Sequence, residues 1–327
     1  MDSILKDYIR PYNPVKDKDL PEYSHSKLEC YTTCPYQFDL KYNQHKTSSD
    51  TTIALELGSL LHLVLEYKGK MIINGKVDYD FLDSLLIDGG PSEDGRGNAI
   101  HIAGLNNLKK KYFEVWIIKD SEGRDYNDKM ANFMKVLHTE MEEDDGWIPA
   151  YFEYPFRYVL MDRIVVHGFI DRIDKREGKD GTEYRLIDYK TSKKVFDSSK
   201  TATSQQFSLY QGAILSEFDT LATECIYRFI CINDSQQALT KGWEKRFASK
   251  ITKVLDEIDE CYKSKVWKPL PKPLCHWCSY STTNPDAHQY KRECEYFSLW
   301  KPTEKTFEVN KEWNPQKEEK VKRIFDW

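Results

Sequence analysis

The sequence predicts a mixed α/β fold with a β-sheet core flanked by helices. Three strand-like runs follow one another with short connections, over residues 151–160, 164–174 and 184–191. A helical pattern over 204–216 comes next, followed by a β-rich run over 225–232. A meander that continues into a helix and another strand is typical of a mixed sheet covered by helices.

The residues before the meander are predicted to form an arm and two helices. Residues 1–23 are polar, contain prolines and show no periodicity, which predicts an extended N-terminal arm. Ser26 is suited to cap a helix over 27–38. Residues 52–70 repeat apolar side chains at spacings of three and four, which predicts an amphipathic helix that carries His62.

The segment that follows this helix is expected to decorate the fold. Residues 71–150 are predicted to form a largely helical insertion, with helices at 103–118 and 126–142. Between them and the preceding helix, residues 84–100 are rich in Gly, Asp and Ser, which predicts a loop. No chemistry is assigned to this insertion.

The whole chain is predicted to hold one elaborated domain. Its 327 residues are enough to bury a substantial core. The domain is expected to span residues 24–300, with an amphipathic helix at 243–263 and a cysteine-rich, metal-binding segment at 264–300. Residues 301–327 are expected to form a charged C-terminal tail.

Composition limits the class of protein and the compartment. The formal net charge of −5 argues against a wholly basic nucleic-acid coat, but 48 Lys and Arg can still form a local basic cleft. A charged-then-apolar leader and an apolar run of about 18 residues are both absent, so a cytoplasmic protein without membrane partners is expected. In that compartment the eight cysteines are expected to be thiols or metal ligands.

An acidic centre is predicted where the third strand of the meander ends. Asp188 and Lys190 are two residues apart, so they project from the same face of an extended chain while Tyr189 points away. An isolated Asp-x-Lys is usually a solvated pair. The functional interpretation therefore depends on the other motifs, of which Asp171 in the preceding strand is the nearest.

Oxygen-rich side chains near this point favour a divalent metal. Mg²⁺ and Mn²⁺ prefer carboxylate, carbonyl and water oxygens. The candidate ligands are two aspartates, one backbone carbonyl and one histidine: Asp171, Asp188, Tyr189 and His62. Lys190 could orient a metal-bound water or stabilise the transition state, and Glu153 in the first strand is a weaker candidate ligand.

A polar pair lies on the helix after the meander. Gln206 and Tyr210 are four residues apart, so they stack on one face of a helix and can reach a common ligand. Both side chains can hydrogen-bond phosphate oxygens. The alternative is a helix face that simply packs on the sheet.

These segments, in this order, resemble the motifs of the PD-(D/E)XK nuclease superfamily and its RecB-like and AddB-like branch. The matching segments lie at residues 58–62, 168–174, 186–191 and 206–210. The resemblance extends over about residues 24–296. It implies a restriction-endonuclease-like sheet and a metal-dependent nuclease.

The family motifs, carried over residue by residue, imply three metal ligands, one catalytic lysine and a pair that grips the substrate. They are His62, Asp171 and Asp188; Lys190; and Gln206 with Tyr210. Asp174, the second acid of its motif, is implied to be structural.

The resemblance implies hydrolysis of DNA phosphodiester bonds with Mg²⁺ or Mn²⁺, most often by an exonuclease that processes DNA ends in phage or bacterial recombination or repair. A structure-specific or single-strand endonuclease of the same fold is an alternative, because the motifs do not show whether a free end is required. A non-catalytic DNA-binding subunit is a third interpretation. The sequence contains no GxxxxGK[ST] phosphate loop, so a helicase is expected only as a partner, as is a single-strand-binding protein or a recombinase.

The cysteines suggest a second metal site. In iron-sulfur members of the same branch, one cysteine of a Cys-Pro motif joins three C-terminal cysteines around a 4Fe-4S cluster with a structural role. Cys34, Cys275, Cys278 and Cys294 match that arrangement. Fifteen residues separate the last two, longer than usual, and His288 lies among them. Cys275, Cys278, His288 and Cys294 could therefore bind Zn²⁺ instead, and free thiols are the remaining alternative.

Overall fold

The computed structural model describes residues 4–46, 51–93, 97–119, 123–142 and 145–272, together with 275, 278–281, 294, 300–301, 306–308 and 320–322. The chain divides into two compact units. Unit 1 comprises Met1–His25 and Thr51–Ala248, and unit 2 comprises Ser26–Asp50 and Ser249–Trp327.

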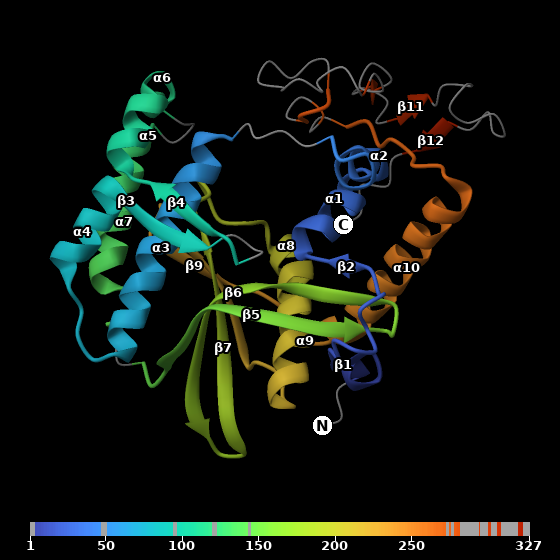
Figure 1. The fold of residues 1–327 in the computed structure, drawn as a ribbon, viewed down its shortest axis with the longest axis horizontal. Coiled ribbons are helices and arrows are strands. Elements are labelled where there is room, and N and C mark those ends of the chain that lie inside the picture. The colour runs from blue at the N-terminus through green and yellow to red at the C-terminus, as the bar shows by residue number, and fades with distance from the viewer. Residues whose placement is uncertain are drawn as a thin grey trace. The chain divides into compact units, whose positions relative to one another are not determined.

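Unit 1 is built on a seven-stranded mixed sheet with the strand order β1-β5-β6-β7-β8-β9, to which β2 adds by pairing with β6 (Figure 1). The strands are β1 (Ile9–Pro11), β2 (Glu22–Tyr23), β5 (Ile148–Leu160), β6 (Ile164–Gly178), β7 (Gly181–Lys190), β8 (Glu224–Phe229) and β9 (Asp234–Gln237). β2–β6 and β7–β8 are parallel pairs, and the other pairs are antiparallel. The predicted mixed α/β sheet flanked by helices is confirmed.

The N-terminal residues supply short strands to this sheet. After the 3₁₀ helix η1 (Ile4–Asp7), β1 pairs with the end of β5. The guanidinium of Arg10 donates two hydrogen bonds, of 2.7 and 2.8 Å, to the carboxylate of Asp17. This pair holds the bend between β1 and β2.

Helices pack on both faces of the sheet. Successive side chains of β7 point to opposite faces, so they show which helix covers each face. Ile187 and Tyr189 point into an apolar cluster formed by α3 (Ile53–Ile73) together with the helices of the insertion. Asp188 points to the other face, where it contacts α9 (Gln205–Phe218). Each helix starts at a side-chain cap, Thr52 for α3 and Ser204 for α9, which accepts a hydrogen bond from a backbone N–H of the first turn.

The insertion between α3 and β5 packs on α3. It contains α4 (Tyr79–Asp88), β3 (Gly89–Glu93), β4 (Ala99–Ala103), α5 (Leu105–Lys111), α6 (Phe113–Trp116) and α7 (Tyr126–Thr139). The segment predicted as a loop is in part the end of α4 and an antiparallel β3–β4 hairpin (Figure 1). Gly89 has a φ of 84° and its α-carbon lies against the backbone of Ile102, so a glycine typical of loops instead starts the hairpin.

Unit 2 combines two distant sequence segments. Its elements are α1 (His25–Thr33), α2 (Pro35–Phe38), the π-helix η2 (Asp39–Asn43), most of α10 (Trp243–Ser264), β10 (Trp300–Lys301), β11 (Thr306–Glu308) and β12 (Lys320–Lys322). Phe38 stacks on Trp267 with ring centroids 5.4 Å apart, and Tyr31 meets both rings edge-on. These aromatic contacts join the early segment of unit 2 to the late one.

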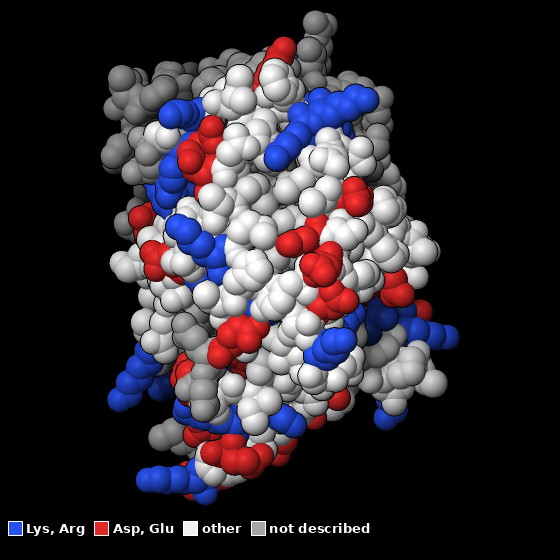
Figure 2. Space-filling model, turned by 90° about the vertical axis from the view of Figure 1, so that its left-hand side faces the viewer, with Lys and Arg blue, Asp and Glu red and all other residues white. Residues whose placement is uncertain are grey.

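The surface carries both signs of charge. On the face drawn in Figure 2, Lys and Arg are interspersed with Asp and Glu and do not join into one continuous basic band. Among the described helices, none is long and apolar enough to cross a membrane.

Candidate active site

Three carboxylates lie side by side across strands β5, β6 and β7. The register of β5 with β6 places Glu153 opposite Asp171, and the register of β6 with β7, continued by one residue, places Asp171 opposite Asp188. Like charges in directly opposed positions destabilise a sheet. Such a row is expected where the sheet serves a function rather than its own stability.

His62 reaches this row from α3. Its Nδ1 lies 3.6 Å from Oδ2 of Asp171 and 4.0 Å from Oε1 of Glu153. Its Nε2 lies 3.1 Å from the backbone carbonyl oxygen of Tyr189. One ligand atom from each of His62, Glu153 and Asp171 falls within 4.8 Å of the others, so these three side chains form a candidate acidic metal site.

Asp188 is held from α9 and from its own strand. Its Oδ1 accepts hydrogen bonds from Nε2 of Gln206, at 2.5 Å, and from the hydroxyl of Tyr210, at 3.4 Å. Its Oδ2 forms an ion pair with the ammonium of Lys190, which also donates to Oε1 of Gln206 at 3.1 Å. The two residues expected to grip the substrate therefore contact the predicted catalytic pair directly.

The backbone of Tyr189 joins the two halves of the site. Its N–H donates to Oδ2 of Asp171 at 2.7 Å, while its carbonyl oxygen lies beside His62. Its side chain is buried on the opposite face of β7, where the hydroxyl lies 3.5 Å from Nη1 of Arg172. The strand thus fixes a carbonyl oxygen, a possible metal ligand, at the edge of the carboxylate row.

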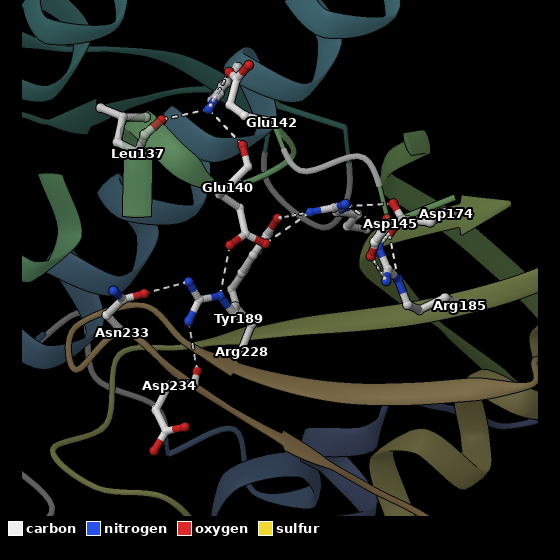
Figure 3. Close-up of polar contacts among 12 residues, drawn as sticks. Leu137, Glu140, Glu142, Asp145, Asp174, Arg185, Tyr189, Arg228, Asn233 and Asp234 are labelled. Carbon is white, nitrogen blue, oxygen red and sulfur yellow. Dashed lines mark hydrogen bonds and ion pairs between the residues drawn. The ribbon is translucent and has the colours of Figure 1, made fainter. Parts of the chain in front are cut away.

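A buried ionic network occupies that opposite face (Figure 3). Arg172 donates to Asp174 at 2.6 and 2.8 Å and to Glu140, after α7, at 3.0 Å. Arg185 donates to Asp174 at 2.6 Å, and Arg228 donates to Glu140 at 2.8 Å. Asp174 is fully buried and satisfied within this network, the position expected of a structural acid.

Burial and mutual repulsion raise carboxyl pKa values in the row. Burial, followed by the charges of Asp171, Glu66 and Asp188, raises the pKa of Glu153 to about 8. Burial also raises the pKa of Asp188 to about 6, although the neighbouring Lys190 opposes the shift.

The backbone at Glu153 has a φ of 44°, an uncommon value for a residue other than glycine.

The donor set fits a hard divalent cation. Carboxylates, a backbone carbonyl and an imidazole are ligands that Mg²⁺ and Mn²⁺ accept. A cation there would also compensate the negative charge that raises the carboxyl pKa values. Of the predicted ligands, His62 and Asp171 lie together, and Asp188 lies beside them but bonded to α9. Glu153, a weaker candidate in the sequence, is the third member of the group.

The predicted cysteine ligands come together in unit 2. Cys34, Cys275, Cys278 and Cys294 all line one pocket. Burial raises the pKa of the Cys278 thiol to about 11, and the nearby sulfur atoms of Cys34 and Cys275 contribute to the shift. Four convergent thiols suit a thiolate-ligated metal or cluster.

Backbone amides also converge on these sulfur atoms. The N–H of Leu270 donates to Sγ of Cys34 at 3.4 Å, and the N–H of Lys272 donates to Sγ of Cys275 at 3.3 Å. Such hydrogen bonds stabilise thiolates. His288, the histidine of the alternative zinc site, lies outside the described residues.

Comparisons with known proteins agree with the motifs. The chain is 25% identical over 214 residues to a subunit of the ATP-dependent helicase/deoxyribonuclease of Clostridium tetani, a match that covers 60% of this chain and 18% of that protein. It is 28% identical over 208 residues to the corresponding subunit from Clostridium acetobutylicum, covering 58% and 17%. The chain thus spans less than a fifth of the length of these relatives.

The family itself is established by a longer match. The resemblance to the RecB-like and AddB-like branch agrees with these relatives. A model of the PD-(D/E)XK nuclease superfamily matches residues 22–283, which is most of the chain. The carboxylate row and its lysine lie inside this match. The chain therefore belongs to the PD-(D/E)XK nuclease superfamily.

Proposed function

We propose that this protein is a metal-dependent deoxyribonuclease that hydrolyses phosphodiester bonds at the carboxylate row of unit 1. The observation that carries the proposal is the row of Glu153, Asp171 and Asp188, with His62 above it and Lys190 beside it. DNA is the proposed substrate because the relatives are named as deoxyribonuclease subunits.

Mg²⁺ or Mn²⁺ is the proposed cofactor. His62, Asp171 and Asp188 would hold it, with the carbonyl oxygen of Tyr189 as a further ligand, and the geometry adds Glu153. When bound, a divalent ion lowers the pKa of a coordinated water and neutralises charge on the phosphate.

The remaining residues orient the reacting groups. Lys190 places its ammonium beside Asp188, where it can donate a hydrogen bond to a phosphate oxygen as negative charge develops. Gln206 contacts both Lys190 and Asp188, so it fixes the direction of each. Tyr210 supports Gln206 through a hydrogen bond of 2.9 Å. The pair thus holds the site in one geometry before the substrate binds.

Exonucleolytic processing of DNA ends, in recombination or repair, is the proposed activity. The relatives are named as subunits of an ATP-dependent helicase/deoxyribonuclease, so a helicase is a proposed partner. A single-strand-binding protein or a recombinase is a further proposed partner. The alternative activity is that of an endonuclease of the same fold, which would also cut DNA without free ends.

A 4Fe-4S cluster is proposed as a structural element of unit 2. The support is that Cys34 and three C-terminal cysteines line one pocket. Protein purified without oxygen is expected to contain about four iron atoms and to absorb near ~400 nm. The Cys34→Ala variant is expected to lose the iron and the absorption. Stoichiometric zinc without iron would replace this assignment with the local zinc site.

A cleavage assay tests the nuclease itself. End-labelled linear duplex, linear single strands and closed circles are incubated with Mg²⁺ or Mn²⁺, with the Asp188→Ala variant as the control. Degradation of linear DNA alone, lost in the variant and in EDTA, supports a metal-dependent exonuclease. Cutting of circles favours the endonuclease, and binding without cutting by the unaltered chain contradicts an enzymatic role.

A further inference from the structure

A groove of about 1000 Å³ in unit 1 opens directly beside the carboxylate row. His62 and Glu153 of the candidate metal site are among the residues that line it. One wall is the exposed face of α3, the other is the β3–β4 hairpin of the insertion, and strands β5 and β6 form the floor. A substrate bound at the site can therefore extend into this groove.

The charges of the groove do not suit a phosphate backbone. Glu66, Glu93 and Glu153 line it, and Lys70 forms an ion pair with Glu66. Affinity for phosphates comes from Lys and Arg, and the face in Figure 2 has no continuous basic band. Among the residues that the structure describes, phosphate contacts are therefore expected at the metal held by the carboxylate row rather than along the walls of the groove.

The groove instead presents exposed apolar side chains. Leu55 on α3 is 65% exposed, Ile100 on the hairpin is 38% exposed, and Phe169 on the floor is 40% exposed. Apolar and aromatic surfaces of this kind bind the flat faces of nucleobases. A base can offer its face only when it is unpaired and unstacked.

Phe169 lies close to the site along the same strand. It precedes Asp171 by two residues in β6, so both side chains project from the same face, about 7 Å apart along the strand. The family motif as it stands in this sequence assigns Asp171 and leaves Phe169 without a role. Its ring is exposed in the groove, on the same face of β6 as the carboxylate row.

We propose that Phe169 stacks on an unpaired base next to the scissile phosphate, and that Leu55 and Ile100 close the groove around that base. The assignment rests on the proposed nuclease function. It makes Phe169 a specificity-determining residue and gives the hairpin of the insertion a function as the outer wall of the substrate groove.

The test measures stacking without cleavage. The full-length chain carrying Asp188→Ala is titrated into a single-stranded oligonucleotide in which one base is 2-aminopurine, whose fluorescence falls when it stacks on an aromatic ring. Binding is followed separately by anisotropy. We expect the fluorescence to be quenched by the chain that keeps Phe169 and by the chain that also carries Phe169→Trp, but not by the chain that also carries Phe169→Ala. The affinity of the Phe169→Ala chain for the oligonucleotide is expected to be lower by about fivefold or more.

Two further variants keep the test specific. Tyr151→Ala removes an aromatic ring on β5 that is 37% exposed and packs on Tyr154 and Phe218, away from the groove, so it is expected to leave quenching unchanged. Ile100→Ser is expected to weaken binding without changing the salt dependence, because it removes no phosphate contact. Equal quenching by Phe169 and Phe169→Ala, or an equal loss in Tyr151→Ala, overturns the proposal.

This readout separates the inference from the proposed function. If quenching depends on Phe169 but the unaltered chain cuts no DNA, the role of Phe169 is supported and the nuclease function is contradicted. If the unaltered chain cuts DNA but quenching does not depend on Phe169, the nuclease function is supported and the role of Phe169 is contradicted.

Discussion

The two faces of strand β7 both bury charged groups, but they balance them differently. On the Tyr189 face, Glu140 and Asp174 are each bonded to two arginines, so the negative charges are matched inside the protein. On the Asp188 face, three carboxylates share one lysine and one histidine. A matched network holds the fold together, whereas an unmatched row has a remaining affinity for cations.

The pKa values of the side chains on each face show the same contrast. Arg172 has a pKa raised above its ordinary value, and burial opposes this shift while the neighbouring Tyr189, Asp174 and Glu140 favour it. In the row, Glu153 and Asp188 have raised pKa values because their charged forms lack sufficient compensation. The partners of the charged groups thus distinguish a structural network from a candidate functional site.

Replacement of Asp188 by asparagine is expected to give the largest effect on cleavage. Asp188→Asn keeps the shape of the side chain but removes the charge of a proposed metal ligand, so the cleavage rate is expected to fall by at least ~1000-fold. The melting temperature of the metal-free protein is expected to stay the same or rise, because one repulsive charge is removed. Cleavage rates near those of the unaltered chain would refute the assignment.

Breaking the network on the other face is expected to affect stability instead. Arg172→Met removes one of the two arginines bonded to each of Asp174 and Glu140, so part of their buried negative charge is no longer compensated. This is expected to cost about 3–5 kcal/mol of unfolding free energy. Urea denaturation followed by circular dichroism measures the change. Arg176→Met on the same strand removes an arginine that is 38% exposed and paired with Glu183, so it is the control and is expected to cost under about 1 kcal/mol. An equal loss of unfolding free energy in the two variants would show that the buried network stabilises the fold no more than an exposed ion pair does.

Loss of the lysine is expected to slow cleavage while DNA binding is retained. Lys190→Met removes a hydrogen-bond donor that is needed mainly when charge develops on the phosphate, so the rate is expected to fall by about 100- to 1000-fold. Anisotropy with labelled single strands, in EDTA, is expected to give an affinity within about threefold of the unaltered chain. A large loss of binding with unchanged turnover would make Lys190 a binding residue.

The smallest expected effect is the pH dependence of the melting temperature of the metal-free protein, which tests the raised pKa of Glu153 directly. Glu153 has a folded pKa of about 8 against an ordinary value of 4.5, so the folded state binds more protons than the unfolded state between these values. Stability is therefore expected to fall as pH rises from about 5 to 8, by a few °C in melting temperature. In Glu153→Gln the decrease above pH 6 should be smaller, and Mg²⁺ should raise the melting temperature of the unaltered chain most at high pH. An identical pH profile in both proteins would place the shift elsewhere.

Short motifs in the sequence are sufficient to predict the fold class, and most of the residues that they single out lie together in the candidate site. Asp188 and Lys190 share a face because of the two-residue period of a strand, and Gln206 and Tyr210 share one because of the helical period, so local spacing predicts both. Glu153 cannot be ranked in this way. Its position depends on the register between β5 and β6, a long-range property that no local pattern contains.

The insertion shows the same limit. Local composition predicts a loop at its hairpin because Gly, Asp and Ser in 84–100 are turn residues, and β3, with the sequence GGPSE, has none of the apolar alternation that indicates a strand. The pairing of β3 with β4 and their position against α3 stabilise them. Tertiary contacts here outweigh a weak local preference.

The division of unit 2 between Ser26–Asp50 and the residues from Ser249 onward has a consequence for synthesis on the ribosome. Cys34 and its aromatic neighbours emerge early, yet the segment that completes their unit is made about 200 residues later. At an elongation rate of about 5–20 residues per second this delay is on the order of 10 to 40 seconds. Throughout that interval the aromatic side chains of α1 and α2 lack the late segment on which they pack, so the early part of unit 2 stays unfinished until the rest of the chain has been made.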